Sequence, residues 1–340
     1  AGRSSSYYQS IINWMYKRHG WKVEREWICH SPGGVTALNI AILSCTQPGD
    51  KILIQPPVYP PFFKAIQTND RRLETNSLKL VNNKYRIDFD DLERKLANGV
   101  KLMILCSPHN PVGRVWTLDE LTKISDLCIK NNIILVSDEI HSDIIYEGYK
   151  HIPVASVNNK ILKQSITCIA PSKTFNIAGF STSAIIIPDK ALRDKFTEGI
   201  NRIGINGGNI FGTTALEAAY TYGEDWVNDL IVYLQQNINF LRNYLEKHLP
   251  KVKAIIPQGT YLVWLDFREL GLDNHELRDF IINDAKVGLN DGIMFGDEGS
   301  GFQRMNIACP RATLLEGLTR LKNVEQELIM KGYNQYKNIS

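Results

Sequence analysis

The chain has 340 residues, of which 44% are hydrophobic and 22% charged, and its formal net charge is +3. This length predicts two domains, or one large domain with an extension, and the composition excludes a large disordered fraction. No block of Lys and Arg stands out, so we expect no nucleic-acid partner. The longest apolar runs are strand-sized and far shorter than a membrane-spanning helix, so we expect no membrane partner either.

The first two thirds of the chain alternate short apolar strands with amphipathic helices, after a helical pattern at residues 7–18. Strands are expected at 51–55, 73–77, 101–106, 133–137, 165–170 and 183–187, and helices at 35–45, 62–68, 88–96, 118–131 and 191–200. Strands that are apolar throughout and separated by helices predict a mainly parallel sheet covered on both faces, which is an α/β fold. Thr117, three residues before Glu120, predicts a capping box at one of these helices.

The pattern changes near residue 230. A long helix at 225–248 ends before Pro250, and strands at 252–256, 261–266 and 302–308 follow, with a helix at 274–284 and a last helix from Thr313. We therefore predict an N-terminal helical segment at 1–30, a large domain at 31–230 and a smaller α+β domain at 231–340.

Six cysteines lie along the chain without a C-x-x-C pair: Cys29, Cys45, Cys106, Cys128, Cys168 and Cys309. Most of them lie in apolar runs, where cysteine behaves as a small hydrophobic residue. We expect free thiols in a reducing compartment, the cytoplasm. No signal or transit sequence is expected at the start.

Polar residues gather where the predicted strands end, which is the edge of a parallel sheet at which ligands bind. They are Gly33-Gly34 before the helix at 35–45, Asn110 after the strand at 101–106, Asp138 after 133–137 and Ser172-Lys173 after 165–170. An amine, a carboxylate and a glycine-rich helix start match the needs of an aldehyde cofactor that carries a pyridine ring and a phosphate. The amine forms a Schiff base, the carboxylate keeps the ring nitrogen protonated, and the helix N-terminus binds the phosphate.

Two stretches carry a resemblance to a known family. Cys-Ser-Pro-His-Asn-Pro-Val-Gly-Arg-Val-Trp at 106–116 and Ala-Pro-Ser-Lys-Thr-Phe-Asn-Ile-Ala-Gly at 170–179 resemble the fold-type-I pyridoxal-phosphate enzymes of the class I/II aminotransferase superfamily. Within that superfamily they are similar to the MalY/PatB group of cystathionine β-lyases, which includes cystalysin. The likeness runs from Tyr8 to about Leu321. It implies pyridoxal 5'-phosphate as cofactor, the aspartate aminotransferase fold with a seven-stranded sheet, and a homodimer.

By position, the resemblance implies Lys173 as the Schiff-base lysine and general base, and Asp138 as the partner of the pyridine nitrogen. Arg304 would bind the substrate carboxylate, because its planar guanidinium can form two parallel hydrogen bonds. The other cofactor-binding residues that it implies are Tyr59 stacked on the ring, Asn110 on the phenolic oxygen, Ser172 with the backbone of Gly34 and Val35 on the phosphate, and His141. Lys173 or Tyr59 would protonate a leaving thiolate, and no metal ion is required.

Each of these residues also has an ordinary structural interpretation. A lysine is most often a surface residue, Asp138 could cap the next helix, and Asn110 before Pro111 could be a turn residue. Tyr59 could be a packing aromatic and His141 a core histidine. Arg311 competes with Arg304 as the carboxylate-binding residue, although the spacing favours Arg304.

Three departures from the wider superfamily stand out. His141 occupies the place of a tyrosine that many aminotransferases have three residues after the aspartate, and Ser181 that of an arginine eight residues after the lysine. Both argue against a close relative of aspartate aminotransferase, and we interpret them as marks of the MalY-like group. The resemblance also implies an N-terminal arm before Tyr8, which is missing from this sequence.

The predicted function is a carbon–sulfur β-lyase that cleaves L-cystathionine or related cysteine S-conjugates to a thiol, pyruvate and ammonia. An aminotransferase of the same superfamily is the alternative, because both reactions share every step up to the carbanion. A non-catalytic transaminase-like sensor is a more remote alternative, since no basic winged-helix segment accompanies the domain. The expected partners are a small amino-acid substrate and a second copy of the chain.

Overall fold

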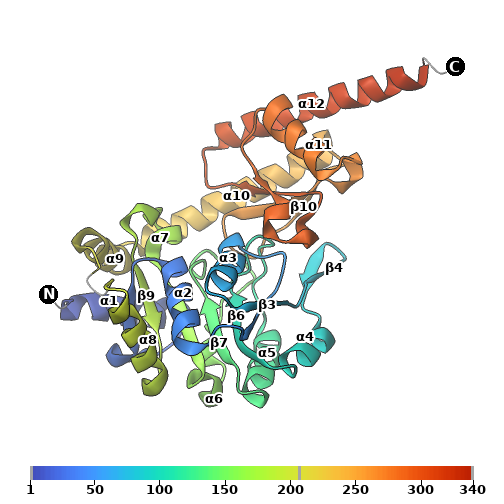
Figure 1. Cartoon of the computed structure of the whole chain (residues 1–340). Helices are drawn as coiled ribbons and strands as arrows, with labels where there is room; N and C mark the ends of the chain where they lie inside the picture. The colour runs from blue at the N-terminus through green and yellow to red at the C-terminus, as the bar shows by residue number, and fades with distance from the viewer. Residues whose placement is uncertain (1–2, 206–207, 338–340) are drawn as a thin grey trace.

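The computed structural model describes residues 3–205 and 208–337, with side chains described as far as residue 327. The chain forms two bodies that are joined along the helix α10 (Glu224–His248) (Figure 1). One body contains a seven-stranded sheet and the other a four-stranded sheet. The predicted boundary near residue 230 lies inside α10, and the division into domains stays a prediction.

The seven-stranded sheet has the order β3-β2-β6-β7-β8-β9-β1. Its strands are β1 (Ile28–Ser31), β2 (Lys51–Ile54), β3 (Arg72–Thr75), β6 (Val100–Cys106), β7 (Ile134–Asp138), β8 (Ser165–Ile169) and β9 (Ser183–Ile186). The pairs from β3 to β8 are parallel, whereas β9 runs antiparallel to both β8 and β1. The prediction of a mainly parallel, seven-stranded α/β sheet is confirmed. The strand β1 was not predicted.

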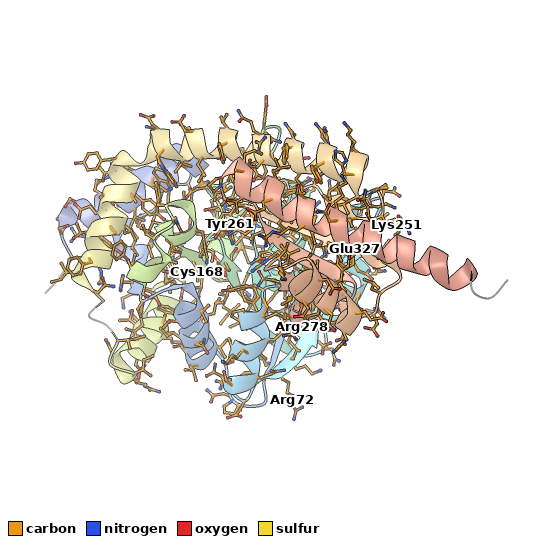
Figure 2. All side chains as sticks on the ribbon, turned by 90° about the horizontal axis from the view of Figure 1, so that it is seen from above. Arg72, Cys168, Lys251, Tyr261, Arg278 and Glu327 are labelled. Carbon is orange, nitrogen blue, oxygen red and sulfur yellow. The ribbon has the colours of Figure 1, made fainter. Side chains whose placement is uncertain are left out.

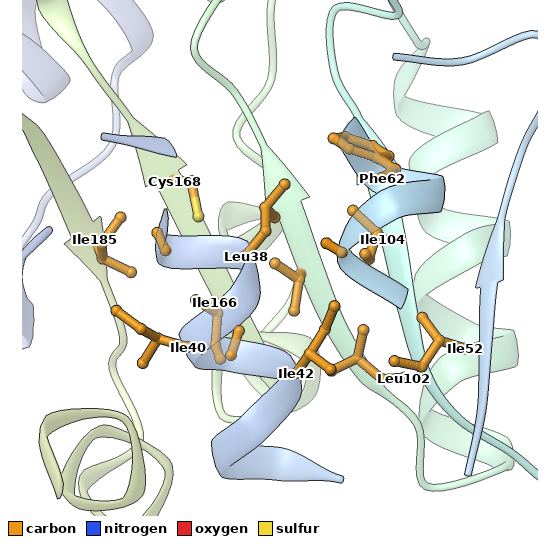
Figure 3. Packing of buried hydrophobic residues seen from close by; sticks show 14 of the residues in the cluster. Leu38, Ile40, Ile42, Ile52, Phe62, Leu102, Ile104, Ile166, Cys168 and Ile185 are labelled. Atoms are coloured by element: carbon orange, nitrogen blue, oxygen red, sulfur yellow. The ribbon is translucent and has the colours of Figure 1, made fainter. Parts of the chain in front are cut away.

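Helices cover both faces of this sheet, because its strands are apolar on both sides. Alternate residues of β6 point to opposite faces, so that Leu102 and Ile104 pack with one group of helices and Met103 and Leu105 with the other. The first group is α2 (Gly34–Cys45), α3 (Pro60–Thr68) and α8 (Lys190–Arg202), and the second is α4 (Phe89–Leu96), α5 (Leu118–Lys130) and α6 (Asn159–Leu162). Figure 3 shows α2 lying across the strands with Leu38 facing them. The predicted capping box of Thr117 and Glu120 is present at α5.

Two further helices cover the β9–β1 edge. They are α1 (Ser5–His19) and α9 (Ile210–Tyr222), which pack against each other and share a cluster of buried residues with β1 and β9. The helix α9 was not predicted.

The four-stranded sheet has the order β10-β11-β13-β12, and all its pairs are antiparallel. Its elements are β10 (Lys253–Ile255), β11 (Leu262–Asp266), α11 (Asn274–Asp279), which continues into η5 (Phe280–Asp284), β12 (Asn290–Asp291), β13 (Phe302–Asn306) and α12 (Arg311–Lys337). The smaller α+β unit is therefore confirmed, with β12 as a strand that was not predicted. No helix in the described part of the chain combines the length and the apolar character that a membrane span needs.

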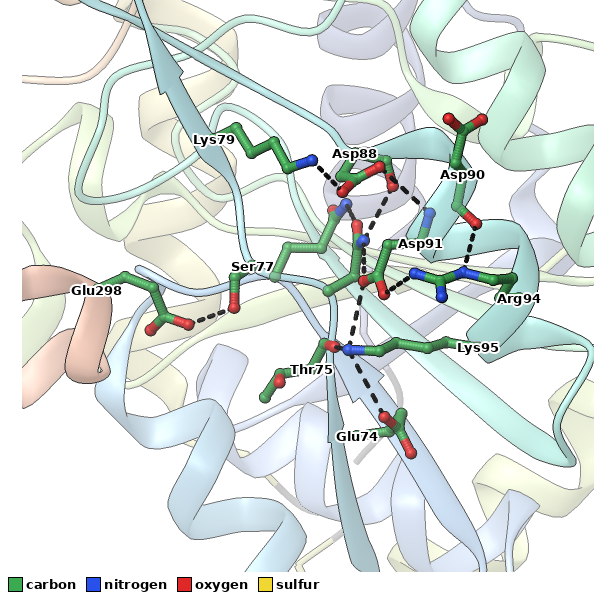
Figure 4. A network of polar contacts seen from close by, with 12 residues as sticks. Glu74, Thr75, Ser77, Lys79, Asp88, Asp90, Asp91, Arg94, Lys95 and Glu298 are labelled. Carbon is green, nitrogen blue, oxygen red and sulfur yellow. Dashed lines mark hydrogen bonds and ion pairs between the residues drawn. The ribbon is translucent and has the colours of Figure 1, made fainter.

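Side chains bind the two bodies together. Trp264 of β11 donates a hydrogen bond to Tyr85 of the hairpin β4 (Lys79–Val81) and β5 (Lys84–Arg86), and within its own sheet it stacks on Phe302 of β13 at 5.3 Å between ring centres. Ser77 donates to Glu298, at the margin of a network of ion pairs around α4 (Figure 4). Tyr261 lies well inside the outline of the molecule, whereas Arg72 lies at its edge (Figure 2). The space beside Tyr261 is the pocket described next.

Candidate active site

A pocket of about 170 Å³ lies where the carboxyl ends of the parallel strands meet the four-stranded sheet. Its lining residues are Tyr59, Cys106, Asn110, Asp138, Ile140, His141, Lys173, Tyr261, Leu262, Asn290, Arg304 and Asn306. Six of the nine predicted site residues are therefore brought together here: Tyr59, Asn110, Asp138, His141, Lys173 and Arg304. Another, larger pocket of about 370 Å³ near Cys309 contains none of them.

The amine and the carboxylate of the pocket influence each other's charge. Burial raises the pKa of Asp138 to about 7, although the backbone N–H of Ile140 and the charge of Lys173 both act to lower it. Burial lowers the pKa of Lys173, while Asp138 acts to raise it. The site thus holds a carboxyl that ionises near neutrality and an amine that loses its proton more readily than a surface lysine. Such shifts in opposite directions are typical of catalytic groups.

His141 is neutral in this pocket. Burial lowers its pKa to about 3, and the charges of Lys173 and Arg304 act in the same direction. Its ring lies 5.5 Å from that of Tyr261, and its Nδ1 is buried without a hydrogen-bond partner. A buried ring nitrogen without a partner leaves one polar group available to a ligand.

Arg304 lies on β13 and reaches across the pocket. Its Nη1 donates to Oδ1 of Asn110 at 2.9 Å, and its Nη2 donates to Oδ1 of Asn290 at 2.7 Å. Its Nε is buried and has no partner. The alternative Arg311 does not line this pocket, because it donates to Asn237 and lies over the ring of Phe240 instead.

The remaining three predicted residues, Gly34, Val35 and Ser172, do not line the pocket. Gly34 begins α2 beside Ile140, whose Cγ2 would be 3.5 Å from an added Cβ. Val35 follows it, and Ser172 precedes Lys173 in the short helix α7 (Pro171–Thr174).

The start of α2 fits a phosphate. Gly33 has φ +107°, a conformation that L-residues with side chains rarely adopt, and no side chain caps the helix. The first backbone N–H groups of a helix have no partner within it, so those of Gly34 and Val35 are free to bind an anion. The amine, the carboxyl group that ionises near neutrality and this helix start together suit pyridoxal 5'-phosphate.

Comparison with known proteins decides the family. Residues 4–321 match the profile of the family described as aminotransferase class I and II. The chain belongs to the class I and II aminotransferase family.

Three relatives resemble it over most of its length. It is 47% identical to cystathionine beta-lyase PatB of Bacillus subtilis (strain 168), over 92% of this chain and 81% of that protein. It is 32% identical to the protein MalY of Escherichia coli (strain K12), over 94% and 82%. The crystal structure of cystalysin from Treponema denticola, which contains a pyridoxal 5'-phosphate cofactor, superposes with a TM-score of 0.95 at 38% identity and covers 96% and 84%.

Sequence reasoning missed several residues that line the pocket of this class I and II aminotransferase. Asn306 could have been found, because it lies two residues after Arg304 on the same strand and therefore on the same face. Tyr261 begins a predicted strand but had no motif to mark it. Asn290 carries no local signal, since only the pairing of β12 with β13 places it opposite Arg304.

Proposed function

We propose that this chain is a pyridoxal-phosphate-dependent β-lyase that cleaves the carbon–sulfur bond of L-cystathionine or a related cysteine S-conjugate. The observation that carries the proposal is the convergence of Lys173, Asp138 and Arg304 on one pocket. The similarity to PatB, which is named a cystathionine beta-lyase, favours elimination over amino transfer. The substrate and water become a thiol, pyruvate and ammonia.

Five side chains would hold the cofactor in this proposal. The amine of Lys173 would attach the cofactor, and Asp138 would accept a hydrogen bond from the protonated ring nitrogen. Asn110 turns its amide N–H toward the phenolic oxygen, because its Oδ1 is already occupied by Arg304. Tyr59 would stack on the ring, and Ser172 with the start of α2 would hold the phosphate.

The chemical step depends on one mobile proton. Bound pyridoxal phosphate supplies a ring that withdraws the electrons left behind when the α-proton is removed. Lys173 takes that proton, since burial lowers its pKa and favours the neutral amine. Arg304 holds the substrate carboxylate, which fixes the direction of the α-proton relative to Lys173. The leaving thiolate receives a proton from Lys173 or Tyr59.

Product analysis tests the proposal directly. Cofactor-loaded protein is incubated with L-cystathionine without any keto acid, and pyruvate, ammonia and homocysteine are measured over time. We expect all three to accumulate in equal amounts over many turnovers. Turnover that starts only after a keto acid is added would show an aminotransferase and overturn the proposal.

Replacing Arg304 by lysine is expected to raise KM for L-cystathionine about tenfold to a hundredfold, with a smaller loss in kcat. Lysine keeps the positive charge but cannot form two parallel hydrogen bonds with a carboxylate, and it would leave Asn290 and Asn110 without their donor. Steady-state kinetics measure the effect. Arg311→Lys is the control, because Arg311 lies outside the pocket, and an equal rise in KM in both variants would contradict the role of Arg304.

We further propose a cytoplasmic homodimer. Ile210 and Phe211 at the start of α9 are 82% and 75% exposed, and Asn209 holds this helix start beside the partly exposed Phe180 through a 2.7 Å hydrogen bond to its carbonyl. Exposed apolar side chains gathered in this way favour a protein interface. All six cysteines are free, which supports a reducing compartment.

A further inference from the structure

Asp143 is a buried carboxylate for which the proposed chemistry has no use. It follows β7, is only 4% exposed, and accepts side-chain hydrogen bonds on both oxygens. Its Oδ1 lies 2.9 Å from Nε1 of Trp14 and 3.1 Å from Nε2 of His19, and its Oδ2 lies 2.8 Å from Oγ1 of Thr174. Asp143 therefore joins α1, which carries Trp14 and His19, to the segment of Thr174, and we call these four residues the Asp143 junction.

The junction is charged and its carboxylate is fully satisfied. Burial acts to raise the pKa of Asp143, but the hydrogen bonds from His19, Thr174 and Trp14 outweigh it, so the pKa lies below its ordinary value. Burial lowers the pKa of His19, although the hydrogen bond and the charge of Asp143 act to raise it. Hydrogen bonds to a buried carboxylate are among the strong ones in proteins.

The hydrogen bond from Thr174 connects Asp143 to the residue next to Lys173. Thr174 is fully buried and is the residue after Lys173 in α7, which has only four residues and no side-chain cap. So short a helix has no stability of its own, and its orientation must come from tertiary contacts. The hydroxyl bond from Thr174 to Asp143 is such a contact.

The hydrogen bond from Trp14 connects Asp143 to a cluster of aromatic rings. Trp14 of α1 stacks on Tyr220 of α9 at 5.1 Å with an angle of 13° between the rings. Phe175, which follows Thr174, packs against both rings at 5.7 and 6.3 Å. The helix α1 thus reaches α7 both through this aromatic cluster and through Asp143.

We propose that Asp143 is a positioning residue, which uses α1 as its support and holds Lys173 toward the pocket through the hydroxyl of Thr174. This inference rests on the proposed function of Lys173. Asp143 does not act through its charge, because the charges that affect the pKa of Lys173 are those of Asp138 and Arg304. The other titratable groups that line the pocket with the amine are Tyr59, Cys106, His141 and Tyr261.

Thr174→Val is the sharpest test. Asp143→Ala would leave three buried donors without a partner and is expected to impair folding, whereas valine removes one hydroxyl and keeps the shape of threonine. Thr174→Ser keeps the hydroxyl and is the rescue variant. Thr167→Val is the matched control, because Thr167 is equally buried on β8 and its hydroxyl has no hydrogen-bond partner.

For Thr174→Val we expect kcat to fall about tenfold while KM stays within about twofold. We also expect the pH midpoint of the visible absorbance change of the cofactor-loaded protein to rise by about half a unit or more. The midpoint rises because the nitrogen of Lys173, which would be held in a Schiff base with the cofactor, meets more water when the helix is loosened, and water stabilises its protonated form. Thr174→Ser and Thr167→Val should keep both values near those of the wild type.

The inference would be overturned if Thr174→Val left both kcat and the pH midpoint of the absorbance change at their wild-type values. It would also be overturned if Thr167→Val changed both values as much as Thr174→Val does. Trp14→Phe tests the same junction from α1, since it removes the indole N–H and keeps an aromatic ring, and it should move the midpoint in the same direction. A separate experiment tests the proposed function of Lys173. Wild-type protein is reduced with borohydride and analysed by peptide mass spectrometry, and the absence of a pyridoxyl group on Lys173 would show that the proposed function itself is wrong.

Discussion

Replacing Lys173 by alanine is expected to lower kcat for thiol release by about 10,000-fold or more. The substitution removes two functions at once, the covalent attachment of the cofactor and the base that takes the α-proton. No other lysine lines the pocket in the part of the chain that the structure describes. Steady-state assays with L-cystathionine measure the loss.

Lys163→Ala is the matched control, because Lys163 is exposed at the end of α6. Borohydride reduction followed by peptide mass spectrometry should find the pyridoxyl group on Lys173 in the wild type and in this control. Turnover near the wild-type level in Lys173→Ala would refute the assignment of the lysine and with it the proposed mechanism.

Asp138→Asn is expected to lower kcat about a hundredfold to a thousandfold, because an amide cannot stabilise a positive charge on the ring nitrogen as a carboxylate does. Asparagine keeps the size of the side chain, so the cofactor should still bind. Steady-state assays with L-cystathionine measure the loss. Full activity in this variant would contradict the role of Asp138.

The same substitution should stabilise the protein when the cofactor is removed. Burial raises the pKa of Asp138 from 3.8 to about 7, so between these values the folded state binds a proton that the unfolded state has released. Stability contributed by this group is therefore present below about pH 4 and lost as the pH rises to about 7. At pH 8, cofactor-free Asp138→Asn should unfold with a free energy about 2–4 kcal/mol higher than the wild type.

Urea unfolding of the cofactor-free proteins at pH 5 and pH 8 measures this difference. Asp126→Asn is the control, because Asp126 is an exposed carboxylate on α5. We expect the gain of Asp138→Asn to grow between pH 5 and pH 8 and that of Asp126→Asn to stay near zero. A gain that is the same at both pH values would contradict the ionisation of a buried Asp138.

Local patterns predicted much of the fold because they depend on nearby residues alone. The apolar strand at 133–137, for example, is buried on both faces, which a continuous run of apolar side chains reveals. The elements that were missed depend on partners far away in the chain. The strand β1 is an edge strand of four residues that exists through its pairing with β9, and β12 has only two residues, which pair with Arg304 and Gln303 of β13.

The candidate site divides in the same way. Asp138 and Lys173 could be predicted because each directly follows a strand of a parallel sheet, and such strand ends meet at one edge. Asn290 and Tyr261 could not, because the packing of the small sheet on the large one brings them to the pocket.

The sequence by itself determined the layered α/β sheet, the polar residues that follow its parallel strands, and the family resemblance. All three depend on short patterns of neighbouring residues. Only the tertiary structure decided which arginine reaches the pocket, how far burial shifts the pKa of Asp138, and that Asp143 joins α1 to the helix of Lys173. These properties depend on distances between side chains and on the exclusion of water from the pocket. Both are set only when segments more than a hundred residues apart in the sequence pack together.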